Sequence, residues 1–469
     1  MPNQPSLETI VALAKRRGFV FPTSTIYGGL ANSYDYGPLG AQLLKNIKDT
    51  WWNTFISTRS DMVGLDSQIL LHPQTWVASG HVGSFSDPLV DDLVTKKRYR
   101  ADHLIEEWIE KKRLKHSSQD IFPVVEDMSM KDMADFIHEN AIKSPDGNAV
   151  SEPKSFNLLF ETSIGTVADD KATVYMRGET AQGIFTNFKN ILDSTRVQLP
   201  FGVGQVGKSF RNEITTGQFI FRTLEFEQAE IEYFFNPNQT KWQELLDMWK
   251  NSMYRFVTNE LGISEDNVRW RRHSDAERSF YSKDTYDLDY NFSFGWKELW
   301  GIAYRTDYDL KQHQKHSGQK LEYRDPHSGE TFTPHVIEPA LGIARVFLMV
   351  LTDAYFDDTD NNRVVLKLKP SLAPYKAAVF PLLKNKPELV SKAREVHAHL
   401  AQKYPSMWDD RGNIGKRYLY QDEIGTPVCI TIDFDTLEDD TVTVRDRNTT
   451  KQERVSVSKL DAYLASVLE

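Results

Sequence analysis

Two short segments rich in arginine, glutamate and phenylalanine constrain most strongly what this chain can fold into. Phe-Arg-Asn-Glu occupies residues 210–213, and Phe-Arg-Thr-Leu-Glu-Phe-Glu-Gln-Ala-Glu occupies residues 221–230. On an extended segment, side chains two positions apart point to the same face, so Arg211 and Glu213 would lie together. Arg211 could then bind a phosphate while Glu213 lies near a nucleotide base.

The returning segment carries a second set of polar and aromatic side chains. Arg222, Phe226 and Glu230 also share one face of an extended segment. That face offers a cation for a phosphate, a ring for a base and a carboxylate for an ammonium group. The two segments together predict a site that holds a nucleotide beside an amino acid.

A helix is the competing interpretation of the second segment, because residues spaced by four also share one face of a helix. Residues 219–235 are rich in aromatic and β-branched side chains, and Asn236-Pro237 follows them as a turn would. These residues favour a strand over residues 219–235.

Length and composition limit the possible classes of protein. A chain of 469 residues needs two or three domains, and 40% hydrophobic content is enough for each to have a core. The single cysteine, Cys429, excludes an internal disulfide and leaves no thiolate set for zinc. The sequence has neither a long apolar run nor a signal-peptide pattern, so we expect a cytoplasmic protein with no membrane contact. A net charge of −10 argues against a general polyanion binder, so RNA binding would use local basic patches.

Helical patterns begin near the N-terminus. Ser6 can cap a first helix that Gly18 ends. A second pattern places four apolar side chains on one helical face, namely Leu44, Ile47, Trp51 and Phe55. This face is either buried in the core of the chain or packed against a second copy. Both interpretations remain open from the sequence.

The regions on either side of the central part have their own patterns. Residues 85–165 look like an insertion, with helices over about 101–114 and after Ser129, and a turn at 144–148. Beyond residue 366 the pattern alternates strands at 377–380, 428–432 and 442–444 with a helix that begins at Pro387. This alternation predicts a small α/β domain.

Five motifs in the same order resemble those of one protein family. Residues 210–230 resemble motif 2 of the class II aminoacyl-tRNA synthetases, in wording close to the glycyl-tRNA synthetases. The other resemblances are to the motif 1 region at 34–40, the glycine-pocket segment at 178–183, motif 3 at 338–345, and the C-terminal anticodon-binding domain at 421–427 and 441–447. The resemblance therefore covers nearly the whole chain.

The resemblance implies an α+β fold. It implies a class II catalytic domain on an antiparallel sheet over residues 1–365, with the insertion at about 85–165 between motifs 1 and 2. It also implies a C-terminal α/β anticodon-binding domain over residues 366–469. In this family the motif 1 helix packs across a dimer interface, so a homodimer is expected.

The implied reaction is the activation of glycine by ATP and its transfer to the 3' end of tRNA(Gly), with release of AMP and diphosphate. Adenylate formation is an attack of a carboxylate on the α-phosphate, so the protein must neutralise charge and align the reactants without a nucleophilic side chain. The implied catalytic residues are Arg211 on the α-phosphate, Arg222 on the γ-phosphate, Glu213, and Arg345, which covers the adenine opposite Phe226. The resemblance further implies that Glu298 holds Mg²⁺; no zinc is expected.

The same resemblance supplies two sets of binding residues. ATP would contact Arg211, Asn212, Glu213, Phe221, Arg222, Thr223, Leu224, Glu225, Phe226, Glu298, Leu299, Gly342, Ile343, Ala344 and Arg345. The amino acid would contact Arg100, Glu179, Phe226, Glu227, Gln228, Ala229, Glu230, Arg305, Glu338, Pro339, Ala340, Leu341 and Gly342.

Glycine has no side chain to recognise, so its charged groups must be bound and larger amino acids excluded by size. In the implied pocket Glu179, Glu230 and Glu338 surround the ammonium, and Arg305 binds the α-carboxylate bidentately. Three positions depart from the usual family pattern and could lower activity: Gly178 for proline, Leu224 for arginine and Ala340 for serine.

Two further functions compete with this one. The chain could be a catalytically inactive, synthetase-like nucleic-acid-binding protein, or a synthetase for another small amino acid. Basic residues of the C-terminal region could contact RNA or could simply be solvated, namely Arg411, Lys416, Arg417, Arg445 and Arg447.

Overall fold

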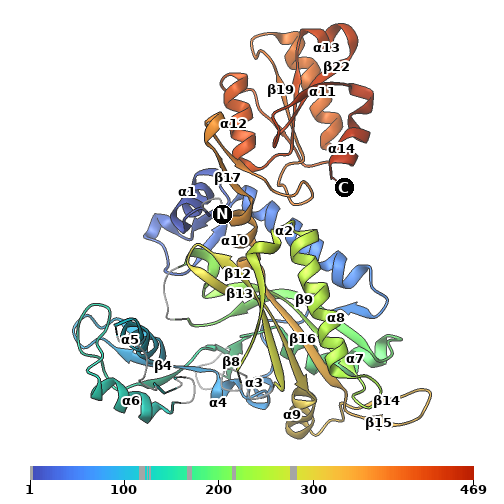
Figure 1. Ribbon diagram of the computed structural model, residues 1–469. Helices are drawn as coiled ribbons and strands as arrows, with labels where there is room; N and C mark the ends of the chain where they lie inside the picture. Colours follow the sequence, from blue (N-terminus) through green and yellow to red (C-terminus); the bar gives the residue numbers. More distant parts are fainter. Residues whose placement is uncertain are drawn as a thin grey trace.

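The computed structural model describes residues 4–115, 122–123, 125, 128–165, 172–213, 218–274 and 282–468. Figure 1 shows a large body built around one sheet, with the C-terminal domain in orange and red at one end. The segment that carries α5 (Ala101–Lys115) and α6 (Met130–Glu139) projects from the body away from that domain. Residues 116–121, 124, 126 and 127 of the predicted insertion lie outside the described residues.

A seven-stranded sheet forms the centre of the body. Its strands, in spatial order, are β11 (Val268–Arg272), β12 (Asp284–Phe292), β13 (Gly295–Thr306), β16 (His335–Gly342), β10 (Glu225–Phe235), β9 (Phe201–Phe210) and β3 (Met62–Gly64). All neighbours are antiparallel except β3 and β9. The predicted antiparallel sheet is confirmed.

The two faces of this sheet have different surroundings. On β10, Ile231, Tyr233 and Phe235 join the core formed with α2 (Pro38–Trp52), α8 (Trp242–Arg255) and α10 (Ile343–Ala354). On the other face Phe234 packs against α7 (Ala181–Ser194), with Leu310 of α9 (Tyr308–Ser317) in the same cluster. Because side chains alternate along a strand, Glu230 and Glu232 lie on this second face.

The N-terminal predictions are confirmed. In α1 (Leu7–Arg17) the Ser6 side chain accepts a hydrogen bond from the Thr9 backbone, and Gly18 ends the helix at a φ of 77°. Ile47, Trp51 and Phe55 are buried within the chain itself, with Leu44 half-buried beside them. This helical face is therefore core.

Residues 219–235 do not form one continuous strand, which corrects the sequence prediction. Phe219–Phe221 is a 3₁₀ turn, η5, and β10 begins only at Glu225. Residues 211–213 also lie outside the strands, because β9 ends at Phe210. The aromatic residues of η5 are buried in the core at the point where the chain reverses. Their burial accounts for the apolar composition of this segment, although it does not form a strand.

The insertion has a core of its own. Its sheet consists of β5 (Arg98–Arg100), β4 (Ser86–Asp91) and β6 (Lys154–Asn157). As predicted, α5 is helical, Ser129 and Asp132 cap α6 reciprocally, and residues 144–148 form a turn.

The C-terminal domain has a mixed five-stranded sheet. Its strands, in spatial order, are β20 (Ser406–Trp408), β19 (Ala377–Pro381), β21 (Val428–Ile432), β22 (Thr441–Asp446) and β23 (Gln452–Ser456). Its helices are α11 (Pro387–Ala401), α12 (Ile414–Ile424), α13 (Phe434–Asp439) and α14 (Leu460–Leu468). The strands and the helix that the sequence pattern predicted in this region are present.

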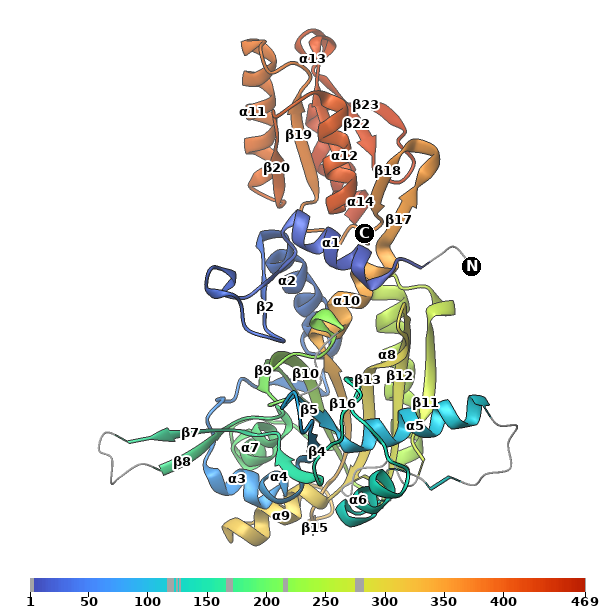
Figure 2. The same cartoon turned by 90° about the vertical axis from the view of Figure 1, so that its left-hand side faces the viewer.

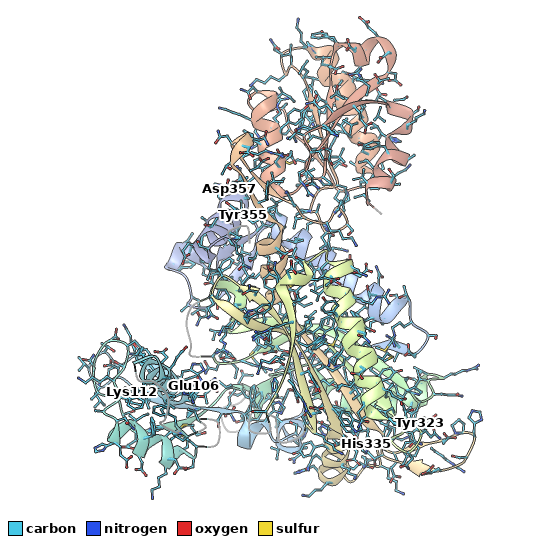
Figure 3. All side chains as sticks on the ribbon, in the orientation of Figure 1. Glu106, Lys112, Tyr323, His335, Tyr355 and Asp357 are labelled. Atoms are coloured by element: carbon cyan, nitrogen blue, oxygen red, sulfur yellow. The ribbon has the colours of Figure 1, made fainter. Side chains whose placement is uncertain are left out.

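Ion pairs join the C-terminal domain to the body. Arg16 and Arg17 of α1 both pair with Glu423 of α12. The connection between the two parts runs through β17 (Tyr355–Asp358) and β18 (Arg363–Leu366), as Figure 2 shows. Tyr355 and Asp357, labelled in Figure 3, mark where β17 leaves the body. The predicted domain boundary at 365 falls within β18.

Short elements complete the fold. They are β1 (Val20–Pro22), η1 (Thr25–Tyr27), β2 (Tyr34–Tyr36), η2 (Asn53–Ser57), α3 (Pro73–Ala78), α4 (His81–Ser84), β7 (Phe160–Ile164), β8 (Ala172–Met176), η6 (Phe256–Glu260), η7 (Glu265–Asn267), β14 (Tyr323–Arg324), β15 (Thr331–Phe332), η8 (Thr359–Asn361) and η9 (Val457–Lys459).

Candidate active site

A cavity of about 230 Å³ opens on the face of the sheet that carries Glu230. Strands β10, β13 and β16 form its floor, the segment that precedes α7 and the turn around η5 form its walls, and the start of α10 closes one end. The lining residues are Glu179, Arg211, Glu213, Ile220, Phe221, Arg222, Thr223, Phe226, Glu227, Gln228, Glu230, Glu298, Gly301, Glu338, Ala340, Leu341, Gly342, Ala344 and Arg345.

Most of the predicted binding residues line this cavity, but some do not. Those outside the lining are Arg100, Asn212, Leu224, Glu225, Ala229, Leu299, Arg305, Pro339 and Ile343. Ala229, Leu299 and Ile343 are core residues that alternate with lining residues along the same strand or helix. Ile220 and Gly301 line the cavity although sequence reasoning did not select them. Ile220 adjoins the selected Phe221, and Gly301 lies two positions after the selected Leu299, so proximity in the sequence could have found both.

The two motif segments meet at the phosphate end of the cavity. The Arg211 backbone N–H donates to the Leu224 carbonyl over 3.0 Å, which holds the two segments together. The Arg211 guanidinium stacks 5.4 Å from the Phe226 ring centre, and its Nε donates to the Gly178 carbonyl. Arg222 lies 3.7 Å from Glu213. The cavity thus has two cations at one end, which is the charge a polyphosphate needs.

A third arginine closes the side of the cavity. Arg345 stacks 4.6 Å from the Phe221 ring centre and pairs with the Glu298 carboxylate over 3.0 Å. Partial desolvation opposes ionisation of Glu298, but Arg345 outweighs it and lowers the pKa of this carboxyl group. Glu298 therefore stays anionic, and it lines the cavity with its side chain 46% exposed. A carboxylate oxygen is the donor type that Mg²⁺ prefers, so this residue fits the predicted ion.

The opposite end of the cavity is acidic. Glu179 lies 3.4 Å from His81 Nε2 and accepts a hydrogen bond from the Gln182 amide over 2.9 Å. Burial opposes its ionisation, yet His81, together with Arg305, holds the pKa of Glu179 below its ordinary value. Glu230 accepts hydrogen bonds from the Thr180 backbone and hydroxyl. Burial, followed by repulsion from Glu179, raises the pKa of Glu230.

Arg305 lies outside the cavity lining and has partners within the protein. Its guanidinium is 1% exposed and is bound along one edge by Asp309, with N···O distances of 2.8 and 2.9 Å. Its remaining nitrogen donates to Glu338 over 2.5 Å. Arg305 therefore orients Glu338, and its predicted bidentate contact with the glycine carboxylate stays a prediction.

Arg100 also has partners within the protein. It lies at the end of β5 in the insertion, where it pairs with Asp87 over 2.9 Å and with Asp102 over 2.5 Å. Both partners come from the insertion, and the guanidinium does not line the cavity. A charged residue in a sequence motif is easily paired by a local carboxylate, as here.

A hydrogen-bonded layer behind the acidic end was not selected from the sequence. The Gln182 amide nitrogen donates to both Glu179 and Asp309, over 2.9 and 3.0 Å. The Gln182 oxygen lies 2.8 Å from His313 Nε2, so His313 must donate there and thereby fixes the amide orientation. Gln182 belongs to the glycine-pocket motif, which was the signal that could have found this layer.

The cavity also contains an unsatisfied acceptor. The Gln228 side-chain oxygen is buried with no hydrogen-bond partner among the described residues. A buried acceptor of this kind costs free energy unless a ligand supplies a donor. Ammonium groups and ribose hydroxyls are such donors.

Gly178 occupies a narrow place beside the cavity. A Cβ added there would lie 3.1 Å from Leu159 and 3.2 Å from Phe85. Its carbonyl accepts the bond from Arg211, so this backbone is held in place in spite of the glycine.

The C-terminal basic residues separate into two groups. Arg417, Arg445 and Arg447 are buried, and Arg445 binds Asp422 with two N···O contacts of 2.7 and 2.9 Å. These three arginines bind partners within the protein. Arg411 and Lys416 are exposed.

Three family profiles match the chain. They are "Glycyl-tRNA synthetase insertion domain 1" at residues 87–123, "tRNA synthetase class II core domain (G, H, P, S and T)" at 160–355, and "Anticodon binding domain" at 376–466.

Curated relatives match over the full length. A glycine–tRNA ligase from Caldanaerobacter subterraneus subsp. tengcongensis is 48% identical, with all of both chains covered. One from Alkaliphilus metalliredigens is 50% identical over 99% of both chains. One from Staphylococcus epidermidis is 48% identical over 98% of both chains. The chain belongs to the glycine–tRNA ligase family.

Membership of this family confirms the resemblance predicted from the motifs. The chain is a class II aminoacyl-tRNA synthetase with a C-terminal anticodon-binding domain. Enzymes of this family are ATP-dependent ligases, so the catalytically inactive alternative is not favoured. Within the described residues, no helix is both long and apolar enough to span a bilayer.

Proposed function

We propose that the chain joins glycine to tRNA(Gly) in this cavity, in two steps that use ATP. The observation that carries the proposal is the separation of charge along one cavity: Arg211, Arg222 and Arg345 line one part, and Glu179, Glu230 and Glu338 line the other. Polyphosphate and ammonium are the complementary ligands.

In the first step the glycine carboxylate attacks the α-phosphate of ATP and diphosphate leaves, which gives glycyl-adenylate. The acidic end holds the ammonium, with Glu179 as the permanent anion, so the carboxylate points toward Arg211. Arg211 then neutralises the charge that develops at phosphorus. Because Arg211 is fixed between the Gly178 carbonyl and the Phe226 ring, little reorganisation is needed when the reaction occurs.

The nucleotide would be held by residues at the other end. Phe226 would stack on the adenine, with Arg345 on its opposite face, and Arg222 would bind the γ-phosphate. Glu298 would hold Mg²⁺, which when bound supplies extra neutralisation of the triphosphate charge. For Glu298 to do this, it must share its carboxylate between the ion and Arg345.

The second step transfers glycine to the terminal ribose of tRNA(Gly). The C-terminal domain would bind the anticodon, where Arg411 and Lys416 are exposed basic residues available for phosphate contacts. Replacing both with alanine should raise the KM for tRNA while glycine-dependent ATP–diphosphate exchange is unchanged. An unchanged KM for tRNA would exclude these two residues from the interface.

A homodimer is part of the proposal, as is a cytoplasmic location. Ile26 and Tyr27 of η1 and Leu30 in the following loop are 86%, 87% and 60% exposed. Neighbouring exposed apolar side chains typically mark an interaction surface. The double variant Ile26→Glu with Tyr27→Glu should sediment as a monomer. Val94→Glu, at another exposed apolar residue, is the matched control and should sediment like the unmodified chain.

The decisive experiment is ATP–diphosphate exchange with glycine, alanine or serine, for the unmodified chain and for Arg211→Ala. We expect exchange with glycine alone and a fall of roughly two orders of magnitude or more in the variant. Lys208→Ala removes a nearby exposed cation that pairs with Glu225, and it serves as the control. A folded protein without exchange would support the inactive nucleic-acid-binding alternative, and exchange with alanine or serine would overturn the glycine assignment.

A further inference from the structure

One buried carboxyl group beside the cavity has no role in the function described above. Glu232 lies on β10, is completely buried, and does not line the cavity. Neither of its carboxylate oxygens has a hydrogen-bond partner among the described residues. A buried carboxylate without partners is one of the most costly groups a protein can contain, so its retention needs an explanation.

The position of Glu232 connects it with the acidic end of the cavity. It shares a face of β10 with Glu230, two residues away. The strand register pairs Glu230 with Ala340 and Tyr233 with Ile337, so Glu232 stands directly across from Glu338 on β16. Oxygen atoms of Glu230, Glu232 and Glu338 all lie within 4.8 Å of one another.

The charges around Glu232 do not balance if every carboxyl group is ionised. The charged and titratable groups that face it are Glu230 on its own strand, Glu338 on β16, Arg305 on β13 and Asp309 on α9. On β9 its neighbour in register is Val203, which carries no charge. Arg305 alone would have to compensate four carboxylates, and its guanidinium is already divided between Asp309 and Glu338.

We propose that Glu232 is a positioning residue that holds a proton and donates it toward Glu338, which keeps Glu338 anionic and aligned for the glycine ammonium. Two carboxyl groups this close in a buried place cannot both be ionised, so they share one proton. Burial, opposed by Arg305, also raises the pKa of Glu338 well above its ordinary value, so the two carboxyl groups compete for the proton. Arg305 donates to Glu338, whereas neither Glu232 oxygen has a partner among the described residues, and this contact favours the proton on Glu232. Burial and the repulsion of Glu338 act in the same direction and raise the pKa of Glu232 well above its ordinary value.

A protonated Glu232 has a defined effect on glycine binding. Its hydroxyl can reach Glu338 by a rotation of the side chain, because the oxygen atoms are already neighbours. The hydrogen bond would restrain Glu338 from a second direction, while Arg305 restrains it from the first. A neutral Glu232 also removes one negative charge from the acidic end of the cavity.

Two substitutions of similar size separate this proposal from a packing role. Glu232→Gln keeps a neutral donor, so the KM for glycine and kcat should stay within about twofold of the unmodified values. Glu232→Met fills the space without a donor, and it should raise the KM for glycine about tenfold with the KM for ATP unchanged. Thermal unfolding of each variant verifies that the protein assayed is folded.

Infrared difference spectroscopy provides a second, direct readout. The unmodified enzyme near neutral pH should show the carbonyl stretch of a protonated carboxylic acid, and Glu232→Gln should lose one such band. Glu225→Gln, on the same strand but exposed, should leave the spectrum of protonated acids unchanged.

Several outcomes would overturn the proposal. If Glu232→Gln raises the KM for glycine as much as Glu232→Met, the negative charge is required, as it would be for a bound cation. If both variants match the unmodified enzyme in KM, Glu232 has no positioning role. Infrared spectra that are the same for the unmodified enzyme and Glu232→Gln would show that the group is ionised.

Discussion

Arg305 and Asp309 form a bidentate ion pair at the junction of β13 and α9, with N···O distances of 2.8 and 2.9 Å. Asp309 in turn accepts a hydrogen bond from Gln182, and Arg305 donates to Glu338. The glycine end of the cavity is therefore built on a connected network rather than on separate side chains. Buried networks of this kind define orientation well as long as every member is satisfied.

The first prediction concerns the shape of Arg305. Arg305→Lys keeps the positive charge, but a lysine cannot bind Asp309 through two parallel hydrogen bonds and also reach Glu338. We expect the kcat/KM for glycine to fall by roughly one to two orders of magnitude while the KM for ATP changes little. Lys311→Ala breaks an exposed pair with Asp307 on the same helix and should have almost no effect. A lysine variant with normal glycine kinetics would contradict the positioning role.

The second prediction concerns the permanent anion of the pocket. Because the pKa of Glu179 is held low, this carboxylate stays ionised at every pH near neutrality. Glu179→Gln removes that charge and should raise the KM for glycine roughly 10- to 100-fold, as expected for a lost charge-assisted hydrogen bond. Steady-state ATP–diphosphate exchange at saturating ATP measures the KM for glycine. If KM is unchanged, the ammonium is bound elsewhere.

The third prediction concerns the pH dependence of stability. The folded state keeps the Glu232 proton at pH values where the unfolded chain has released it, because burial raises this pKa from an ordinary value of 4.5. The unfolded state then binds fewer protons, so the free energy of unfolding falls as pH rises through this window. The contribution is complete below the ordinary pKa and is lost as pH approaches the raised one.

Glu232→Gln cannot titrate, so its stability should fall less with pH than that of the unmodified chain. Thermal unfolding midpoints at about pH 5.5 and about pH 8.5 should therefore differ less in the variant. Glu388→Gln, an exposed change on α11, should retain the slope of the unmodified chain. Parallel slopes for all three proteins would contradict a raised pKa at Glu232.

The fourth prediction concerns the junction between the body and the C-terminal domain. Asp422 is completely buried and accepts from Arg363 over 2.8 Å and from Arg445 over 2.7 and 2.9 Å. Asp422→Ala leaves two buried arginines without their shared partner and should destabilise the protein by about 3 to 5 kcal/mol. Chemical denaturation of the full chain gives the value. A loss of stability below about 1 kcal/mol would show that this network contributes no more than a surface ion pair does.

Much of the fold was predictable from local patterns. The caps of α1 and α6, the start of α11 at Pro387 and the strands of the C-terminal domain follow from spacing and capping residues within a few positions of one another. Phe219–Phe221 was predicted wrongly, because aromatic residues favour strands and buried turns equally well when only composition is considered.

The candidate site was also predictable only in part. The sequence by itself determined which residues come to the cavity, because the motifs specify Arg211, Glu179 and their neighbours by order and spacing. Only the tertiary structure decided which of these side chains remain available to a ligand. Arg305 and Arg100 carry charges that local carboxylates already satisfy, and Glu232 faces Glu338 only through the pairing of β10 with β16. Charge pairing depends on distance in three dimensions, which a linear pattern does not record.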